Sequence, residues 1–335
     1  MYLRDLGEFG IIAHIRDMFP FRKAFLGVGD DCAIFEGREG FWSLVSVDSQ
    51  VEGTHFRLSL VPPKILGRRL LRVNLSDIAA MGGIPCYALA SFVLREDVHF
   101  DWLKEVLEGI REEAENNDME VIGGNLACTR GEMVLDIVVL GEVEQSRPLL
   151  LRRNARVGDV IFVTGYPGEA GAGFLLAERQ NDPGVYRPLL ERFLLPEPRL
   201  RVGRFLGEFG ARIALIDISD GFLQDLGHIL EESEVGALLF KENIPVSSLL
   251  AQFCKAERRD PFEFVFRGGE DFELIFTVPR DLADVVERYF KECLDISLHR
   301  VGEIIEGRGI LLEEDGRVSP LSPKGWNHFT PKEEA

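Results

Sequence analysis

The sequence predicts a mixed α/β fold arranged in two domains. The chain has 335 residues, which is more than the roughly 100–200 residues of a typical single domain. Strand-like and helix-like hydrophobic patterns alternate along its length, as they do in α/β proteins. A polar, arginine-rich stretch at 144–158 separates two such series. We therefore expect one domain over 1–148 and a second over 149–335.

The first half alternates short β-rich runs with amphipathic segments. The run at 41–47 is apolar, rich in residues favoured in strands, and ends at Asp48. A helical pattern stops at the glycine pair 82–83, where a helix commonly ends. The last strand contains Asp136, which either points inward or marks an irregularity. In order, we expect a strand at 41–47, a helix at 63–81, a strand at 86–94, a helix at 100–117 and a strand at 133–143.

The second half repeats the same alternation. This alternation of strands and helices indicates a mixed α/β architecture. The expected elements are a strand at 160–164, a helix at 168–180, a strand at 213–218, a helix at 222–232, a strand at 272–278 and a helix at 282–290. The segment 165–173 is rich in small residues and leaves two possibilities open. It either receives a phosphate at a helix N-terminus or allows close helix packing, and we favour packing.

The composition argues against several classes of protein. Lys and Arg number 38 and Asp and Glu 56, which gives a formal net charge of −18. That charge repels nucleic acid and anionic membranes, so we expect neither as a partner. The longest apolar runs are well short of a membrane helix, and the first residues do not resemble a signal peptide. Five scattered cysteines lack metal or redox spacing, so we expect reduced, mostly buried thiols and a cytoplasmic protein.

Acidic residues gather at the ends of expected strands. Ligands of α/β proteins bind at the carboxyl ends of strands, and several carboxylates there repel one another unless a cation lies between them. Hard oxygen ligands of this kind suit Mg²⁺. Each residue alone could equally form a turn or cap a helix. The acidic residues beside expected strands are Asp30, Asp31, Asp48, Asp217, Asp220, Glu270 and Asp271. Asp77 belongs to the same set but lies inside or at the end of the helix expected at 63–81.

No familiar phosphate-binding motif accompanies these carboxylates. The sequence has no GxxxxGK[ST] loop, no protein-kinase catalytic set and no dinucleotide fingerprint. The ordered segments instead resemble the thiamine-monophosphate kinase family, in the superfamily of aminoimidazole ribonucleotide synthetase and selenophosphate synthetase. The blocks at 74–77 and 217–221 are common to the superfamily, whereas those at 51–56 and 324–329 resemble the kinase. The matching stretches are 7–13, 27–33, 47–56, 74–82, 123–124, 155–159, 163–165, 217–221, 268–274 and 324–329.

The resemblance implies a two-domain PurM-like architecture. Its N-terminal domain pairs into a homodimeric β-barrel and binds ATP and Mg²⁺, and its C-terminal domain is an α/β sandwich. It also implies roles for residues at matching positions. The implied metal ligands are Asp31, Asp48, Asp77, Asp217 and Asp220, assisted by Asp30 and Ser46. The implied ATP contacts are Gly124, Arg152 and Ser219. The implied substrate contacts are His55, Glu270 and Trp326.

One part of the family pattern is altered. Asn125 stands where the family has a metal-binding aspartate that also belongs to the ATP site, and two extra residues follow within 125–131. An asparagine oxygen can still bind Mg²⁺, but with one negative charge fewer. We retain Asn125 as a candidate for both sites. The effect of the altered segment on activity stays open, as do the number of Mg²⁺ ions and a requirement for a monovalent cation.

The resemblance implies that ATP donates its γ-phosphoryl group to thiamine monophosphate. We find no nucleophile–histidine pair, and the acceptor phosphate needs no strong base because it is already largely ionised. Two alternatives remain. One is another ATP-dependent member of the superfamily, similar to aminoimidazole ribonucleotide synthetase. The other is a nucleotide-binding relative without catalytic activity, which the asparagine at position 125 suggests.

Overall fold

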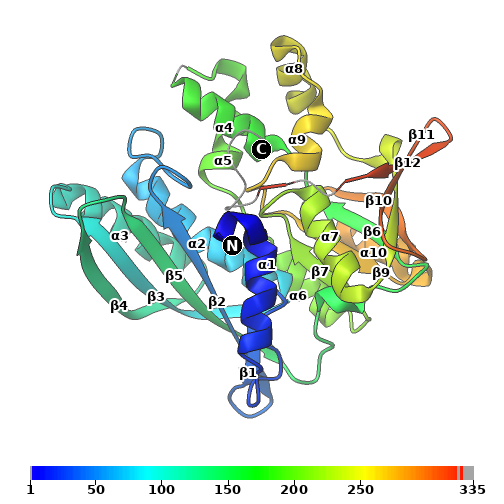
Figure 1. The fold of residues 1–335 in the computed structure, drawn as a ribbon, viewed down its shortest axis with the longest axis horizontal. Helices are drawn as coiled ribbons and strands as arrows, with labels where there is room; N and C mark the ends of the chain where they lie inside the picture. Colours follow the sequence, from blue (N-terminus) through cyan, green and yellow to red (C-terminus); the bar gives the residue numbers. More distant parts are fainter. Residues whose placement is uncertain (1, 181, 323–324, 327–335) are drawn as a thin grey trace.

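The strands form two separate sheets. The computed structural model describes residues 2–180, 182–322 and 325–326. The sheet on the left of Figure 1 has five strands in the order β1-β2-β5-β3-β4, and that on the right has seven in the order β12-β11-β8-β10-β6-β9-β7. The predicted mixed α/β class is confirmed. Neither sheet closes into a barrel within the described part of the chain.

The five-stranded sheet is covered by helices on one face. Its strands are β1 (Ala33–Glu36), β2 (Phe41–Val51), β3 (Ile84–Arg95), β4 (Glu120–Thr129) and β5 (Val134–Glu144). The helices are α2 (Pro63–Ala80) and α3 (Phe100–Asn116). Leu135, Ile137 and Val139 of β5 are fully buried on the covered face. Pro63 starts α2, where its missing N–H costs no helical hydrogen bond.

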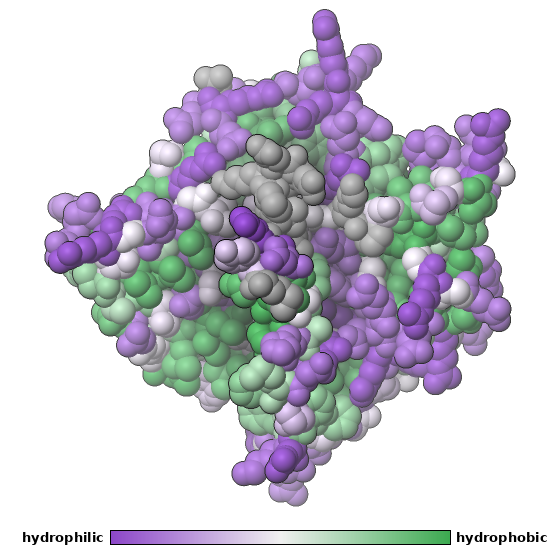
Figure 2. Space-filling view, in the orientation of Figure 1, coloured by the Kyte–Doolittle hydropathy of each residue, from purple (hydrophilic) through white to green (hydrophobic). Residues whose placement is uncertain are grey.

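The other face of this sheet carries apolar rows, and no helix within the described residues covers it. Val47, Val138 and Leu89 form one cross-strand row. Val47 is 57% exposed, and Tyr87, two rows away on the same face, is 45% exposed. Figure 2 shows a hydrophobic area over the visible part of this sheet. Asp136 also lies on this face, so the expected inward orientation is wrong, because inward positions of β5 alternate with it.

The seven-stranded sheet is packed on both faces. Its strands are β6 (Val160–Thr164), β7 (Ala214–Asp217), β8 (Gly236–Phe240), β9 (Leu274–Val278), β10 (Leu298–Ile305), β11 (Gly309–Glu314) and β12 (Arg317–Leu321). One hydrophobic core includes Ile161 and Ile275 with residues of α7, and another includes Phe162 and Phe276 with residues of α6 and α10. Alternate residues of one strand thus enter opposite cores.

The remaining helices surround the second sheet. The α-helices are α4 (Glu169–Arg179), α5 (Arg187–Leu194), α6 (Leu200–Glu208), α7 (Phe222–Ser233), α8 (Ser248–Glu257), α9 (Pro261–Arg267) and α10 (Ala283–Cys293). The short 3₁₀ helices are η1 (Arg152–Asn154), η2 (Gly184–Tyr186), η3 (Lys241–Asn243) and η4 (Arg280–Leu282). Helix α2 packs on β2 and β5 of the first sheet and also on α6 and β7. It therefore joins the two halves of the chain.

Several elements were not expected from the sequence. Helix α1 (Leu3–Met18) was missed because Gly7, with φ of 66°, interrupts its helical geometry. It lies in front of the junction between the two sheets (Figure 1), and Arg16 pairs with Glu232 of α7 at 2.7 Å. Strand β4 was also missed. It runs to Thr129, so the altered segment 125–131 begins within a strand.

The small-residue segment before α4 packs closely, as expected. A side chain at Gly168 would lie 2.7 Å from the backbone of Phe264. The amides of Gly168 and Ala170 donate to the carboxylate of Asp271 at 2.7 and 3.0 Å. This helix N-terminus already holds a carboxylate, so the geometry favours packing over phosphate binding.

Two further expectations concern cysteines and membranes. Cys32 and Cys254 are buried, but Cys86 is only partly buried and Cys128 and Cys293 are exposed. The expectation of mostly buried thiols is therefore wrong, because Cys128 and Cys293 lie on an edge strand and a surface helix. All five are free. None of the helices in the described ranges has the length and apolar character needed to cross a membrane.

Candidate active site

Three carboxylates from distant parts of the chain converge at the junction between the two sheets. Asp31 precedes β1, Asp77 lies in α2, and Asp217 is the last residue of β7. One carboxylate oxygen from each lies within 4.8 Å of the others. The structure therefore brings together three of the aspartates that the sequence placed in a metal site.

Helix α2 is tied to β2 by polar side chains on one face. Ser46 Oγ donates to Asp77 Oδ2 at 2.6 Å. The backbone amide of Asp48 donates to Asn74 Oδ1 at 3.0 Å, and Asn74 Nδ2 donates to the carbonyl of Leu70. Positions 74 and 77 are three apart and share a helix face. Because of this spacing, the block 74–77 both hydrogen-bonds to β2 and places the carboxylate of Asp77 beside that strand.

Arg152 neutralises one side of the cluster. Its Nη2 donates to Asp31 Oδ1 at 2.5 Å, and its backbone amide donates to Asp30 Oδ2 at 3.2 Å. Asp30 Oδ1 accepts from the amide of Asp31. The second oxygen, Asp31 Oδ2, is buried and has no hydrogen-bond partner among the described residues. A buried acceptor without a donor is costly, and a cation would satisfy it.

Burial raises the pKa of several of these carboxyls. Burial and the charge of Asp31 raise the pKa of Asp217 to about 8 and that of Asp30 to about 7. Burial and the charges of Asp48, Asp217 and Asp31 raise the pKa of Asp77 well above its usual value. Asp48 thus lies within electrostatic reach of the cluster. Crowded hard oxygens with an unsatisfied acceptor fit a divalent cation such as Mg²⁺.

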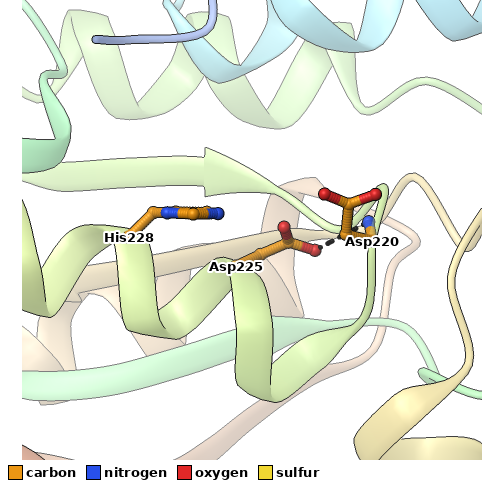
Figure 3. Close-up of side chains that lie close together, drawn as sticks. All are labelled: Asp220, Asp225 and His228. Carbon is orange, nitrogen blue, oxygen red and sulfur yellow. Dashed lines mark hydrogen bonds between the residues drawn. The ribbon is translucent and has the colours of Figure 1, made fainter. Parts of the chain in front are cut away.

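A second group continues from the loop that follows β7. Asp220, Asp225 and His228 each offer an atom within 4.8 Å of the other two, and Figure 3 shows them along the start of α7. Asp225 Oδ2 accepts from the amides of Asp220 and Gly221 at 3.1 and 2.9 Å. Burial and the charge of Glu8 raise the pKa of Asp220 to about 7.

Sequence reasoning missed Asp225 and His228. The available signal was their spacing of three residues in the helix after the aspartate-rich loop, which places them on one face. Burial, followed by the charge of Arg152, lowers the pKa of His228 to about 4. Its imidazole ring lies 4.6 Å from the ring of Phe9. This histidine is therefore neutral near pH 7 and packs under α1.

Glu270 and Trp326, two of the three expected substrate contacts, lie against the loop formed by 217–221. The backbone amide of Glu270 donates to the carbonyl of Ser219 at 2.7 Å. The backbone amide of Trp326 donates to the carbonyl of Asp220 at 2.9 Å. The Glu270 side chain pairs with Arg69 Nη2 at 2.6 Å. Glu270 therefore forms an ion pair. The sequence had suggested a substrate contact or a residue in a turn or cap, and neither role included this pair.

His55 lies at a separate small hollow. Its Nδ1 accepts from the amide of Val51 at 3.0 Å, which fixes the ring. The hollow is also lined by Phe174 of α4 and Phe193 of α5. The carbonyl of Phe193 accepts a hydrogen bond from Arg69. Phe193 therefore lies at the hollow that His55 lines and also binds Arg69, the ion-pair partner of Glu270.

The structure does not bring Asn125 to the carboxylates of its own chain. Gly124 pairs with Ala90 in the cross-strand row that includes Asp48. Asn125 is in the next row and therefore on the opposite face of the sheet. A side chain at Gly124 would lie 1.7 Å from the carbonyl oxygen of Ala90, so this position requires glycine. The assigned roles of Gly124 and Asn125 stay predictions.

Known proteins resemble the chain across almost its whole length. The family described as AIR synthase related protein, N-terminal domain, matches residues 29–143, and its C-terminal counterpart matches 156–313. Thiamine-monophosphate kinase of Bacillus subtilis (strain 168) is 35% identical over 312 residues, which cover 91% of this chain and 93% of that protein. The chain belongs to the thiamine-monophosphate kinase family. The kinase from Aquifex aeolicus (strain VF5) is 32% identical and covers 98% of this chain and 100% of its own length.

Solved structures agree with the family membership. The structure of AaThiL complexed with AMPPCP and TMP has a TM-score of 0.86 and 32% identity, and covers 98% of this chain and 99% of its own. Escherichia coli HypE, a hydrogenase maturation protein, has a TM-score of 0.69 at 21% identity and covers 84% of this chain and 85% of its own. The second likeness shows the shared fold alone. The two-domain PurM-like architecture expected for the thiamine-monophosphate kinase family is therefore present.

Proposed function

We propose that this chain is an ATP-dependent kinase that converts thiamine monophosphate to thiamine diphosphate. The observation that carries the proposal is the convergence of Asp31, Asp77 and Asp217 within a full-length match to kinases of that name. The structure of AaThiL with AMPPCP and TMP supports both substrates. The products are thiamine diphosphate and ADP.

The reaction requires charge neutralisation and alignment more than acid–base catalysis. The attacking group is an oxygen of the thiamine phosphate, which is largely ionised near pH 7. It attacks the γ-phosphorus of ATP while the bond to the β-phosphate oxygen breaks, so ADP leaves. Both reactants are anions. A site of unpaired carboxylates alone would repel them.

Different residues of the chain would supply the charge neutralisation and the alignment. Asp31, Asp77 and Asp217 would hold Mg²⁺, with Asp48 and Asp220 beside them. Bound Mg²⁺ supplies positive charge to the phosphates of both substrates. Arg152 holds Asp30 and Asp31 in place and adds a fixed positive charge. Asp77 accepts a hydrogen bond from Ser46, which restrains its carboxylate beside the cluster.

The remaining proposals concern the residues that would contact ATP and the thiamine portion of the substrate. We propose that Gly124 and Ser219 contact ATP, and that His55, Glu270 and Trp326 contact the thiamine portion. Trp326 offers a half-exposed aromatic face, 42% exposed, to a cationic ring. We also propose a domain boundary at 148/149, which the division of β1–β5 and β6–β12 into two sheets supports. A cytoplasmic location and a monovalent-cation requirement stay predictions.

The product of the reaction tests the proposal directly. Purified protein, ATP and Mg²⁺ are incubated with thiamine monophosphate, thiamine or formylglycinamidine ribonucleotide, and the products are measured by liquid chromatography and mass spectrometry. We expect thiamine diphosphate and one equivalent of ADP from thiamine monophosphate alone. Turnover of the ribonucleotide alone would favour the aminoimidazole ribonucleotide synthetase alternative. ATP binding without any product would favour the non-catalytic alternative.

We further propose that the chain forms a homodimer through the uncovered face of the first sheet. That face presents the rows Val47–Val138–Leu89 and Val45–Leu140–Tyr87. Val47 and Tyr87 are exposed in these rows, and contiguous exposed apolar residues of this kind commonly mark a protein interface. Two such sheets packed face to face would cover both apolar faces and produce the expected barrel.

The substitution Val47→Asp tests this dimer. It places a charge in the middle of the apolar face, where burial against a second copy would desolvate it. We expect sedimentation velocity to show a dimer for the unmodified protein and a monomer for the variant. Val318→Asp is the matched control because Val318 is 55% exposed, close to the 57% of Val47, but lies on β12 of the other sheet. A dimeric Val47→Asp variant would contradict the proposed interface.

A further inference from the structure

Arg69 is a buried cation that links the two halves of the chain. It lies on α2, and its side chain is fully buried. Nη1 donates to the carbonyl of Phe193 on α5, and Nη2 pairs with Glu270 Oε1 at 2.6 Å. The guanidinium also lies over the Phe193 ring, 5.1 Å from its centre. A buried charge is tolerated only when it is paired and hydrogen-bonded, so Glu270 is held firmly.

The backbone around Glu270 needs such restraint. Glu270 and Phe272 have φ values of 64° and 51°, a left-handed conformation that residues other than glycine rarely adopt. Gly269 packs so closely that an added side chain would lie 2.5 Å from the Ser219 carbonyl oxygen. Unfavourable backbone geometry of this kind persists only where surrounding contacts impose it.

This segment contacts the aspartate loop directly. The amide of Glu270 donates to the Ser219 carbonyl at 2.7 Å, and the amide of Phe272 donates to the Ile218 carbonyl at 2.8 Å. The loop formed by 217–221 carries Asp217 and Asp220. Helix α2 also carries Asp77, two turns after Arg69. One rigid helix therefore fixes both a carboxylate of the cluster and the segment 268–272.

We propose that Arg69 is a positioning residue for substrate binding, which acts by holding Glu270 and the segment 268–272 against the aspartate loop. The inference rests on the proposed function, in which Glu270 contacts thiamine monophosphate. In this role Arg69 acts through Glu270 and the segment 268–272 rather than by binding the substrate itself. Without Arg69, the segment 268–272 loses its ion pair with α2, and the side chain of Glu270 is no longer held in one orientation toward the substrate.

The test compares Arg69→Met with Arg68→Met. Methionine retains an apolar stem but removes the charge and the hydrogen bonds. Arg68 is a matched control because it neighbours Arg69 on α2 and pairs with buried Glu113 at 3.0 Å, which involves no substrate segment. We expect the KM for thiamine monophosphate to rise about tenfold in Arg69→Met, as for loss of one charge-assisted hydrogen bond. The KM for ATP stays within about twofold, and Arg68→Met changes neither KM.

Hydrogen exchange gives a second measurement that does not depend on activity. Arg69→Met should accelerate exchange of the amides of Glu270 and Phe272, whereas Arg68→Met should not. If Arg69→Met does not fold, Arg69→Lys is used. It retains a charge that can reach Glu270 but not Phe193 as well, so smaller changes in the same direction are expected.

The outcomes separate this inference from the proposed function. An inactive unmodified protein would contradict the kinase assignment, and the exchange experiment would still decide whether Arg69 holds the segment. Equal KM values and equal exchange in the Arg69 and Arg68 variants would overturn the positioning role. Lower thermal stability alone, without either change, would also overturn it.

Discussion

Replacing Asp77 with asparagine is expected to lower the kcat for thiamine diphosphate formation by about 10²- to 10³-fold, the size typical for loss of one charged or polar stabilising group. The side-chain shape and the hydrogen bond from Ser46 are retained, since an amide oxygen also accepts. The Mg²⁺-free protein should melt at the same temperature or higher, because the change removes one of several mutually repelling carboxylates. Steady-state kinetics and calorimetry measure both effects.

Asp159→Asn is the control for this variant. Asp159 is a buried aspartate that pairs with Arg212 at 2.7 and 2.8 Å, outside the cluster. Breaking that pair should lower the melting temperature and leave kcat close to normal. The opposite pattern, a stable and fully active Asp77→Asn variant, would remove Asp77 from the metal site.

The second large effect is a pH-dependent stabilisation by Mg²⁺. The folded pKa values of Asp30, Asp217 and Asp220 are raised to about 7, 8 and 7, from the usual 3.8. The folded Mg²⁺-free protein therefore holds protons that the unfolded chain releases. The stability that these groups contribute is fully present below about pH 4. It is lost as the pH rises through 7 to 8. Without Mg²⁺, the melting temperature should fall from pH 6 to 8.5.

Mg²⁺ should reverse this loss because it binds the ionised carboxylates and displaces their protons. At 100 times its Kd, a ligand specific to the folded state adds about 2.7 kcal/mol. The melting-temperature increase caused by Mg²⁺ should therefore grow with pH, and titration calorimetry in two buffers should detect proton release. Asp217→Asn should weaken the dependence between pH 7 and 8. An increase that is the same at every pH would contradict this prediction.

The sequence was most informative where local pattern determines structure. The apolar spacing of α2 and the glycines after it predicted the helix closely. The acidic set picked out in the sequence includes Asp31, Asp77 and Asp217, which the structure brings together. Only Asp217 lies at the carboxyl end of a strand, where ligands of α/β proteins bind, whereas Asp31 precedes β1 and Asp77 lies in α2. The resemblance to the thiamine-monophosphate kinase family added the functional assignment of each residue.

The features that the sequence did not reveal depend on contacts between residues far apart in the chain or on pairing with a neighbouring strand. The ion pair between Arg69 and Glu270 joins residues 201 positions apart, and no periodicity reports such a contact. Strand β4 contains paired glycines that weaken strand propensity, yet pairing with β3 imposes the strand. Asp271 resembled part of an acidic site but caps α4. Its role became visible only once the two segments were placed together.

Transfer of labelled phosphate tests the central claim most directly. The unmodified protein and Asp77→Asn are incubated in parallel with ATP labelled at the γ-phosphate, thiamine monophosphate and Mg²⁺, and the label in thiamine diphosphate is quantified by chromatography. The account predicts that the label enters thiamine diphosphate in equal amount to the ADP formed, and that Asp77→Asn almost abolishes this transfer. Label found only in inorganic phosphate, with a folded protein and no labelled thiamine diphosphate, would contradict it.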